Sequence, residues 1–201
     1  MLVKAISNKK RRDITINKIY PVIIKEDNDI RIIDDFGGLS IYELDDFQVY
    51  KKNINSYTKY RDSLVYSLID YPSFLENYYN DNKKAMSDVV NSQINIFEED
   101  LNAEELEGVI KSENYSSYEK IVFIEAVKNK LTNELARSLA NYLQKKYQIE
   151  QELLLPICKL LSKYQIQEVY DLFLNIMFDN TMNNESVQNI IIEYFNSYYE
   201  K

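Results

Sequence analysis

Strand signals and helix signals occupy different parts of this chain, and the division falls near Tyr50. Almost all of the short β-branched and aromatic runs precede this residue, together with two of the three glycines, Gly37 and Gly38. Helical periodicity and helix-capping pairs dominate the sequence after it. The pattern predicts an α+β chain, with a small β-domain over residues 1–50 and a helical domain of about nine helices over residues 51–201.

The first part of the sequence predicts five short strands separated by polar turn signals. A strand pattern that repeats over so short a stretch favours a small barrel, because closing a sheet removes its unpaired edges. The strands are expected over 2–7, 14–25 (with a break at Lys18), 30–33, 39–42 and 47–50.

Three stretches of this β-domain carry a resemblance: Ile14–Val22, Ile32–Gly37, and the later pair Tyr42 and Phe47. They resemble the small SH3-like barrel of low-GC Gram-positive bacteria and their phages. That pattern has a hydrophobic-Thr-x-Gly-Lys-x-Tyr strand, an Ile-x-Asp-Asp-x-Gly hairpin, and a late Tyr and Phe. This chain departs from it by having Asn17 where glycine is usual. The resemblance implies a fold and no activity, because such barrels serve as accessory and adaptor modules.

Helix starts are signalled repeatedly after residue 51, including three pairs with capping-box spacing: Ser73 with Glu76, Asn102 with Glu105, and Ser116 with Glu119. Two successive helix pairs of equal length, Tyr118–Tyr147 and Ile149–Phe178, indicate stacked helical hairpins weakly similar to HEAT-like repeats. An irregular helical bundle is the alternative. Helices are expected over 56–69, 72–80, 83–98, 102–112, 117–130, 133–147, 149–163, 165–178 and 184–199.

The composition excludes several classes of enzyme. Histidine is absent, which removes Ser-His-Asp and Cys-His catalysis, and Cys158 is the only cysteine, which removes internal disulfides and cysteine-based zinc sites. Asp35-Phe36-Gly37 matches a kinase metal-binding tripeptide without its companion motifs and is expected to form a β-turn. We therefore expect a cytoplasmic, non-catalytic protein with no metal, no cofactor and no membrane segment.

Acidic and aromatic side chains give the candidate partner-binding residues. The net charge is −8, and an acidic surface attracts basic partners. Adjacent tyrosines on a helix cannot both face one core, so one of each pair is expected at the surface. Alternatively, the acids lie at an exposed junction between helices and bind no partner. The candidates are Glu98, Glu99, Asp100, Glu104, Glu105, Glu107, Tyr78, Tyr79, Tyr198 and Tyr199.

One basic cluster, Lys9, Lys10, Arg11 and Arg12, precedes the second strand signal. It is the candidate for nucleic-acid contact, since clustered cations bind the phosphate backbone. Nucleic acid is the less favoured partner, because one patch must overcome the negative charge of the whole chain.

The favoured hypothesis is a protein that binds and neutralises a basic partner protein, in the style of the immunity proteins of bacterial polymorphic-toxin systems. A phage or prophage regulator or anti-defence protein is a second hypothesis with the same motivation. A nucleic-acid-associated adaptor that uses Lys9–Arg12 is a third. A carboxylate-only hydrolase is chemically allowed without histidine, but no pair of acids is placed across a cleft by the sequence.

Overall fold

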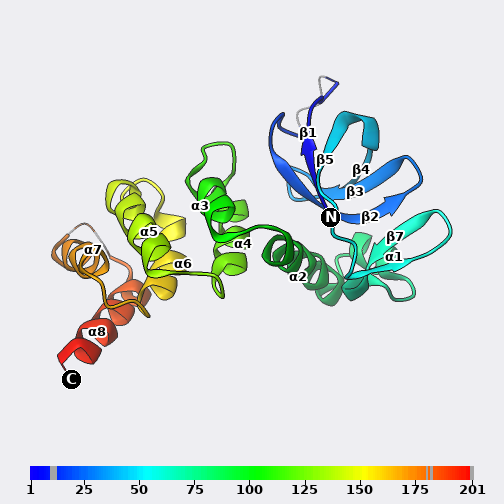
Figure 1. Cartoon of the computed structure of the whole chain (residues 1–201). Helices are drawn as coiled ribbons and strands as arrows, with labels where there is room; N and C mark the ends of the chain where they lie inside the picture. The colour runs from blue at the N-terminus through cyan, green and yellow to red at the C-terminus, as the bar shows by residue number, and fades with distance from the viewer. Residues whose placement is uncertain (10–12, 180, 182, 200–201) are drawn as a thin grey trace. The chain divides into compact units, whose positions relative to one another are not determined.

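The chain forms two compact units, Met1–Leu101 and Asn102–Lys201, in the computed structural model (Figure 1). The structure describes residues 1–9, 13–179, 181 and 183–199. For 198 and 199 this description covers the backbone only. The first unit holds an antiparallel sheet and the second holds helices, so the α+β class is confirmed.

The described part of the first unit contains seven strands in one antiparallel sheet. Five of them follow the order β4-β3-β2-β1-β5, while β7 pairs with both β2 and β6. The strands are β1 (Leu2–Ala5), β2 (Ile19–Glu26), β3 (Asp29–Ile33), β4 (Leu39–Glu43), β5 (Phe47–Lys51), β6 (Tyr57–Lys59) and β7 (Ser63–Tyr66).

Strand β2 holds the sheet together because different parts of it pair with different neighbours. Its first residues pair with β1, with Pro21 opposite Leu2, and its last residues pair with β7, with Ile24 opposite Val65. The rings of Tyr20 and Tyr42 both meet Phe47 edge-on, with centroids 6.1 and 6.0 Å apart. The aromatic residues of the SH3-like pattern therefore lie in the core of this sheet.

One helix prediction and one strand prediction in this unit are wrong. The helix expected over 56–69 is replaced by β6, β7 and a short 3-10 turn, Ser67–Ile69. The β-branched and aromatic residues of this stretch suit a pleated surface, and the edge of β2 offers them a partner. The strand expected over 14–17 does not form. The chain turns there instead: the Lys18 amide donates to the Thr15 carbonyl at 3.2 Å, and Asn17 has a φ of 70°, in the left-handed region.

Two helices also belong to the first unit: α1 (Phe74–Tyr79) and α2 (Lys83–Asp100). Helix α2 packs against β1 and β2 and buries the side chains of Val89, Ile96 and Phe97. Because β7 and α2 both attach to β2, the first unit ends at Leu101, whereas the sequence placed the domain boundary at residues 50–51.

The second unit consists of six helices among the described residues, which makes eight α-helices in all where about nine were expected. They are α3 (Ala103–Lys111), α4 (Ser117–Val127), α5 (Asn133–Lys146), α6 (Gln151–Leu161), α7 (Gln167–Phe178) and α8 (Glu185–Tyr199).

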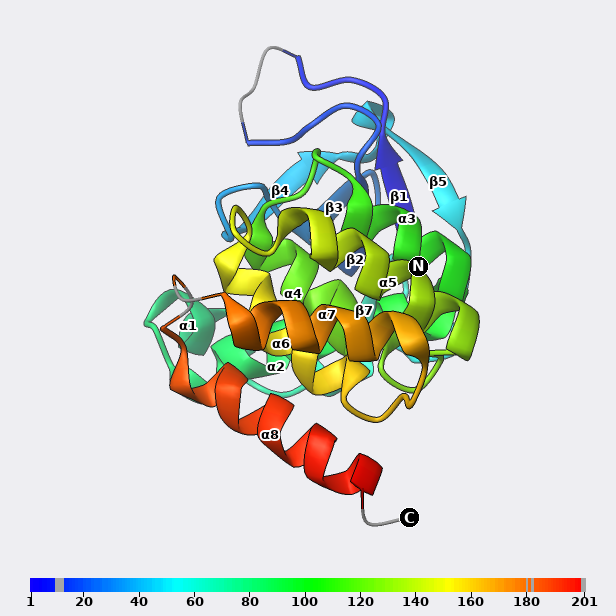
Figure 2. The ribbon, with the colours of Figure 1, turned by 90° about the vertical axis from the view of Figure 1, so that its left-hand side faces the viewer.

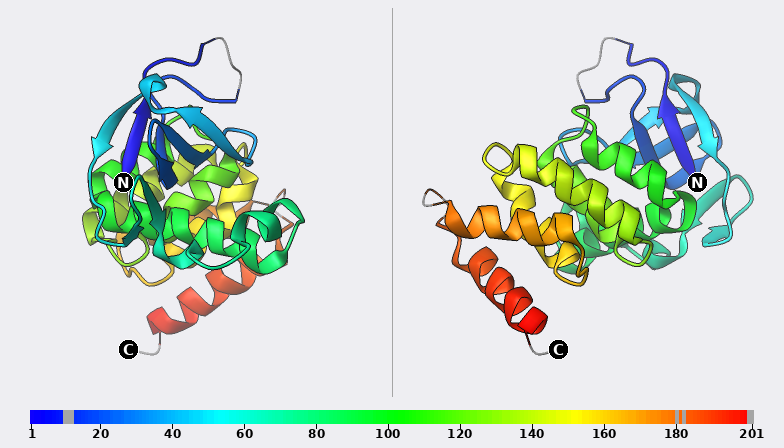
Figure 3. Two further views of the ribbon diagram at one scale, coloured as in Figure 1. Left: turned by 90° about the vertical axis from the view of Figure 1, so that its right-hand side faces the viewer. Right: turned by 60° about the vertical axis from the view of Figure 1, so that its left-hand side comes forward.

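These six helices form two layers. Helices α3, α5 and α7 contact one another in order, and so do α4, α6 and α8 (Figures 1 and 2). Each hairpin joins one helix of each layer: α3 with α4, α5 with α6, and α7 with α8, the last pair seen at the end of the array in Figure 3. Stacked hairpins were expected, but the sequence analysis paired α4 with α5 and α6 with α7, one helix later than the observed pairs. Equal helix length does not determine which apolar faces meet.

Two of the three predicted capping boxes are present. Asn102 and Glu105 exchange hydrogen bonds at the start of α3, and Ser116 and Glu119 do the same at the start of α4. Ser73 does not cap α1, because its φ of 59° is incompatible with the extended backbone that an N-cap residue adopts.

Candidate functional site

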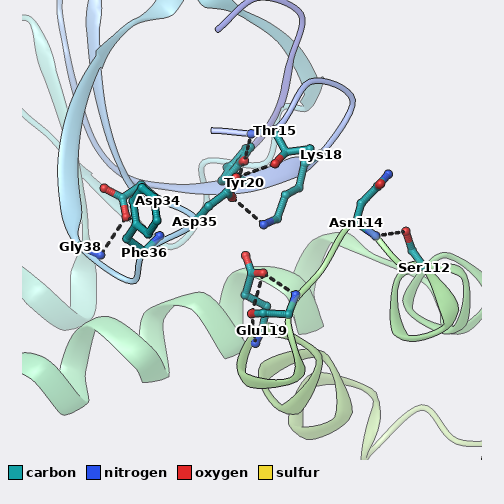
Figure 4. Close-up of polar contacts among 11 residues, drawn as sticks. Thr15, Lys18, Tyr20, Asp34, Asp35, Phe36, Gly38, Ser112, Asn114 and Glu119 are labelled. Atoms are coloured by element: carbon teal, nitrogen blue, oxygen red, sulfur yellow. Dashed lines mark hydrogen bonds and ion pairs between the residues drawn. The ribbon is translucent and has the colours of Figure 1, made fainter. Parts of the chain in front are cut away.

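A polar network inside the first unit explains the Thr-x-x-Lys-x-Tyr spacing of the sequence (Figure 4). Asp35 accepts hydrogen bonds from Thr15 Oγ1 at 2.6 Å, from Lys18 Nζ at 2.5 Å and from Tyr20 Oη at 2.7 Å. The Tyr20 hydroxyl also accepts the Thr15 amide at 2.8 Å. Lys18 is 2% exposed, so its ammonium group is held in the interior by this carboxylate. These residues join two loops and are structural.

Asp34, the neighbour of Asp35, organises the hairpin that joins β3 to β4. One oxygen of its carboxylate accepts the amides of Phe36 and Gly38, each at 3.0 Å, and the other accepts the Ser40 hydroxyl at 2.6 Å. Gly37 has a φ of 84°. The β-turn expected at Asp35-Phe36-Gly37 is confirmed.

The acidic partner-binding candidates predicted from the sequence are divided between the two units, which meet in the chain at Leu101. Within the first unit, the Glu99 carboxylate accepts the hydroxyls of Ser56 at 2.9 Å and Tyr66 at 3.3 Å. Burial, reinforced by the Glu99 carboxylate, raises the pKa of Tyr66 to about 12. The Asp100 side chain is 3% exposed and lies 3.3 Å from the Met1 amino group. Glu98 is half-buried. Asp100 is thus removed from the surface and Glu99 is engaged locally.

Within the second unit, Glu105 closes the capping box of α3 and Glu107 links α3 to α5. The Glu107 carboxylate accepts Lys111 Nζ from its own helix and Ser138 Oγ from α5. Burial opposes its ionisation, but these two hydrogen bonds outweigh burial and hold the pKa of Glu107 below its ordinary value. Glu104 is exposed. Most acids of this stretch therefore have local contacts, and Glu99 and Glu104 are its exposed members.

Tyr78 and Tyr79 cover the outer edge of β4. The Leu39 amide donates to the Tyr78 hydroxyl at 3.1 Å, and the Tyr79 hydroxyl donates to the Leu39 carbonyl at 2.9 Å. The two hydroxyls stand where a neighbouring strand would supply hydrogen bonds. Tyr79 is nevertheless 57% exposed, so it is the surface member of the pair. The side chains of Tyr198 and Tyr199 lie outside the described residues.

The basic loop is described only at Lys9, and Lys10, Arg11 and Arg12 lie outside the described residues. The Lys9 ammonium group donates to Glu43 and lies 3.4 Å from Asp46. The hydrogen bond to Glu43 raises the pKa of Lys9. Lys9 is thus neutralised by acids of its own unit.

A groove that the sequence analysis missed lies in the first unit, between β5 and the hairpin of β6 and β7. Its volume is about 580 Å³. The aliphatic part of its lining is Leu44, Val49, Ile54 and Leu64, and its cations include Lys52, Lys59 and Arg61.

The three cations are exposed, and within the described ranges no hydrogen bond or ion pair engages them. They are separated by up to nine positions in the sequence, so no run of basic residues marks them. The signal that could have revealed them is the cluster Lys59-Tyr60-Arg61 at a hairpin tip, which requires the β6–β7 hairpin to be predicted first.

The described residues provide no group of three or more Cys, Asp and Glu side chains that could hold a metal ion. None of the helices in the described ranges has both the length and the apolar character needed to cross a bilayer. No protein-family model, curated protein or solved structure matches this chain, so no relative supplies a ligand or a partner for comparison.

Proposed function

We propose that this chain is a non-catalytic protein-binding protein of the immunity or antitoxin type, whose helical unit covers a basic surface of a partner protein. The observation that carries the proposal is the two-layered array of α3–α8. Stacked hairpins present an extended surface built from successive repeats, and that architecture serves binding. The unit contains 15 Asp and Glu residues against 10 Lys and Arg, so its field favours a basic partner.

Three acids of the helical unit share the same position in their helices. Glu104, Glu134 and Glu168 are each the second residue of a helix, in α3, α5 and α7. Alternate helices of stacked hairpins run in the same direction, so these first turns lie along one edge of the layer. Glu168 accepts Arg137 Nε at 2.6 Å, whereas no ion pair among the described residues engages Glu104 or Glu134. We assign Glu104 and Glu134 to the partner-binding edge.

Helix dipoles alone favour carboxylates at these positions, so their presence has a local reason as well. Glu104 and Glu134 differ from Glu168 because both are exposed and neither forms an ion pair among the described residues, so both charges are available to a partner. Tyr79 belongs to the other unit, and its hydroxyl is engaged by β4.

We also propose that the sheet of the first unit is an SH3-like barrel that acts as an accessory module. The support comes from the residues of the pattern: Ile14, Tyr20, Val22 and Ile32 lie in one buried cluster with Tyr42 and Phe47. Asn17, at the usual glycine position, adopts a φ of 70°, which asparagine tolerates better than most residues.

Co-expression with the product of the neighbouring gene tests the proposed function. We expect a stable complex and protection from the toxicity of that product. Reversing two charges, Glu104→Lys with Glu134→Lys, is expected to weaken the complex at least tenfold, about 1.4 kcal/mol. Glu152→Lys with Glu193→Lys is the matched control, since both side chains are exposed and lie in the other layer, on α6 and α8, and it should leave binding within about twofold. Absence of both a complex and protection would contradict the proposal.

The remaining hypotheses are separated by simple observations. Phage structural genes beside this gene would favour a phage regulator over an immunity protein. A nucleic-acid adaptor predicts filter binding near 50 mM salt, and the absence of binding there would remove it. The pairing of Lys9 with Glu43 and Asp46 weakens the case for the adaptor.

A further inference from the structure

We propose that the groove between β5 and the β6–β7 hairpin binds an extended acidic peptide segment of a partner protein. The proposal is independent of the edge formed by Glu104 and Glu134, because the two surfaces belong to different units and carry opposite charge. The groove combines two properties that such a segment needs, namely cations without partners and an aliphatic lining.

The cations of the groove are free to meet an anion. Lys52, Lys59 and Arg61 have no hydrogen-bond or ion-pair partner within the described ranges, while Lys25 donates to the Asp27 carbonyl at 2.5 Å. The charge of the surrounding sequence agrees with this assignment. Residues 1–66 contain 12 Lys and Arg against 10 Asp and Glu, whereas residues 67–201 contain 12 against 22. Four of these 12 cations belong to the cluster Lys9–Arg12, whereas the lining itself carries Lys25, Lys52, Lys59 and Arg61 against Asp27 and Asp62.

The lining favours a peptide over a nucleic acid. Single-stranded nucleic acids bind on stacked aromatic side chains, and here the lining supplies one aromatic residue, Tyr60, whose hydroxyl donates to Asp70 at 2.7 Å. Asp27 and Asp62 also line the groove, so an acidic segment must place its carboxylates at Lys52, Lys59 and Arg61 and away from these two side chains. Val49 and Ile54 are 44% and 37% exposed, which leaves apolar surface for aliphatic side chains of a peptide.

The edge strand explains why the peptide should be extended. Strand β5 ends the order of the sheet and pairs with β1 alone among the described strands. An extended segment that lies beside β5 would direct its side chains alternately toward the groove and toward solvent. The long side chains of Lys52, Lys59 and Arg61 can reach carboxylates on either face of such a strand.

Fluorescence anisotropy with labelled 12-residue peptides tests the proposal on the full chain. A peptide of alternating Glu and Leu supplies both kinds of contact, and we expect it to bind at least tenfold more tightly than peptides of alternating Lys and Leu or of alternating Glu and Ser. The double variant Lys59→Glu with Arg61→Glu should weaken binding of the Glu-Leu peptide at least tenfold.

Two further variants make the result specific to the groove. Ile54→Ser removes exposed apolar surface without changing charge and should weaken binding about threefold or more. The matched control, Lys159→Glu with Lys163→Glu, reverses two exposed charges of the helical unit and should leave binding within twofold. Circular dichroism checks that each variant is folded, and folding is expected because all of these side chains lie at the surface.

Three results would overturn the assignment: no binding of the Glu-Leu peptide, binding that the groove variants do not change, or tighter binding of a 12-nucleotide oligothymidylate that Lys59→Glu with Arg61→Glu abolishes. The last would make the groove a nucleic-acid site. The reversal of Lys59 and Arg61 should not affect capture of a basic partner, and Glu104→Lys with Glu134→Lys should not affect the peptide. The two sets of variants therefore distinguish a failure of the peptide-binding proposal from a failure of the proposed function.

Discussion

Removal of the Asp35 carboxylate should destabilise the first unit more than any other single polar substitution in its β1–β5 region. In Asp35→Ala, Lys18 Nζ loses a carboxylate at 2.5 Å, and the hydroxyls of Thr15 and Tyr20 each lose a hydrogen bond to the same group. Lys18 is 2% exposed, so water cannot replace the carboxylate without local opening. Removing one partner of a buried ion pair costs about 3–5 kcal/mol.

Removal of the other partner should cost less. In Lys18→Met, Asp35 keeps two hydroxyl donors, and its side chain is 15% exposed to water. The expected cost is about 1.5–3 kcal/mol, the value of one hydrogen bond to a charged group. The double variant removes the buried ammonium group together with the carboxylate that balances it, so it should be more stable than Asp35→Ala alone.

Urea denaturation of the full chain, followed by hydrogen exchange in peptides from β2 and β3, isolates the free energy of unfolding of this unit. The double-mutant cycle should give a coupling of at least about 1 kcal/mol. An additive cycle, or a cost below about 1 kcal/mol for Asp35→Ala, would show that the network is solvated and would refute the reasoning.

Three further perturbations test other parts of the structure. Asn17→Ala should lower stability by about 1 kcal/mol because Asn17 has a positive φ, whereas Asn17→Gly should not; equal losses measured by thermal denaturation would contradict this. The pKa of Glu107 is lowered on folding, so its contribution to stability is present above its ordinary value of 4.5 and is lost as the pH falls through the lower folded value; Glu107→Gln should flatten this acid dependence in urea melts. Burial raises the pKa of Cys158 to about 12, so iodoacetamide at pH 8 should label this thiol only in denaturant, and rapid labelling of the folded chain would show that the site opens.

The sequence predicted the helices after residue 72 well, because their caps and apolar periodicity are local signals. Helix α3, for example, starts after Asn102 as its capping box indicated. The core of the sheet was also anticipated by the positions of Tyr42 and Phe47. Both successes depend on patterns contained in a few neighbouring residues.

The failures depend on contacts between distant segments. Residues 57–66 form strands because Val65 pairs with Ile24, some 40 positions earlier, and no local pattern contains that information. Glu99 could not be distinguished from a free charge, because its partner Ser56 comes from another element. For Glu107 only the contact with Ser138 is non-local, since Lys111 lies four positions later in the same helix. The groove was missed for the same reason, since its cations come together only after β6 and β7 are placed.

Strand β2 pairs both with β1, which precedes it in the chain, and with β7, which is synthesised much later. This pairing has a consequence for synthesis on the ribosome. Residues 19–26 emerge well before residues 63–66 of β7. At about 5–20 residues per second, the edge of β2 that β7 covers stays open for roughly 2–8 seconds. During this interval the nascent chain carries an unpaired, β-branched edge that other nascent chains could join. Slow decoding between β5 and β7 should therefore lower the yield of folded protein, while the same delay between the later hairpins should not.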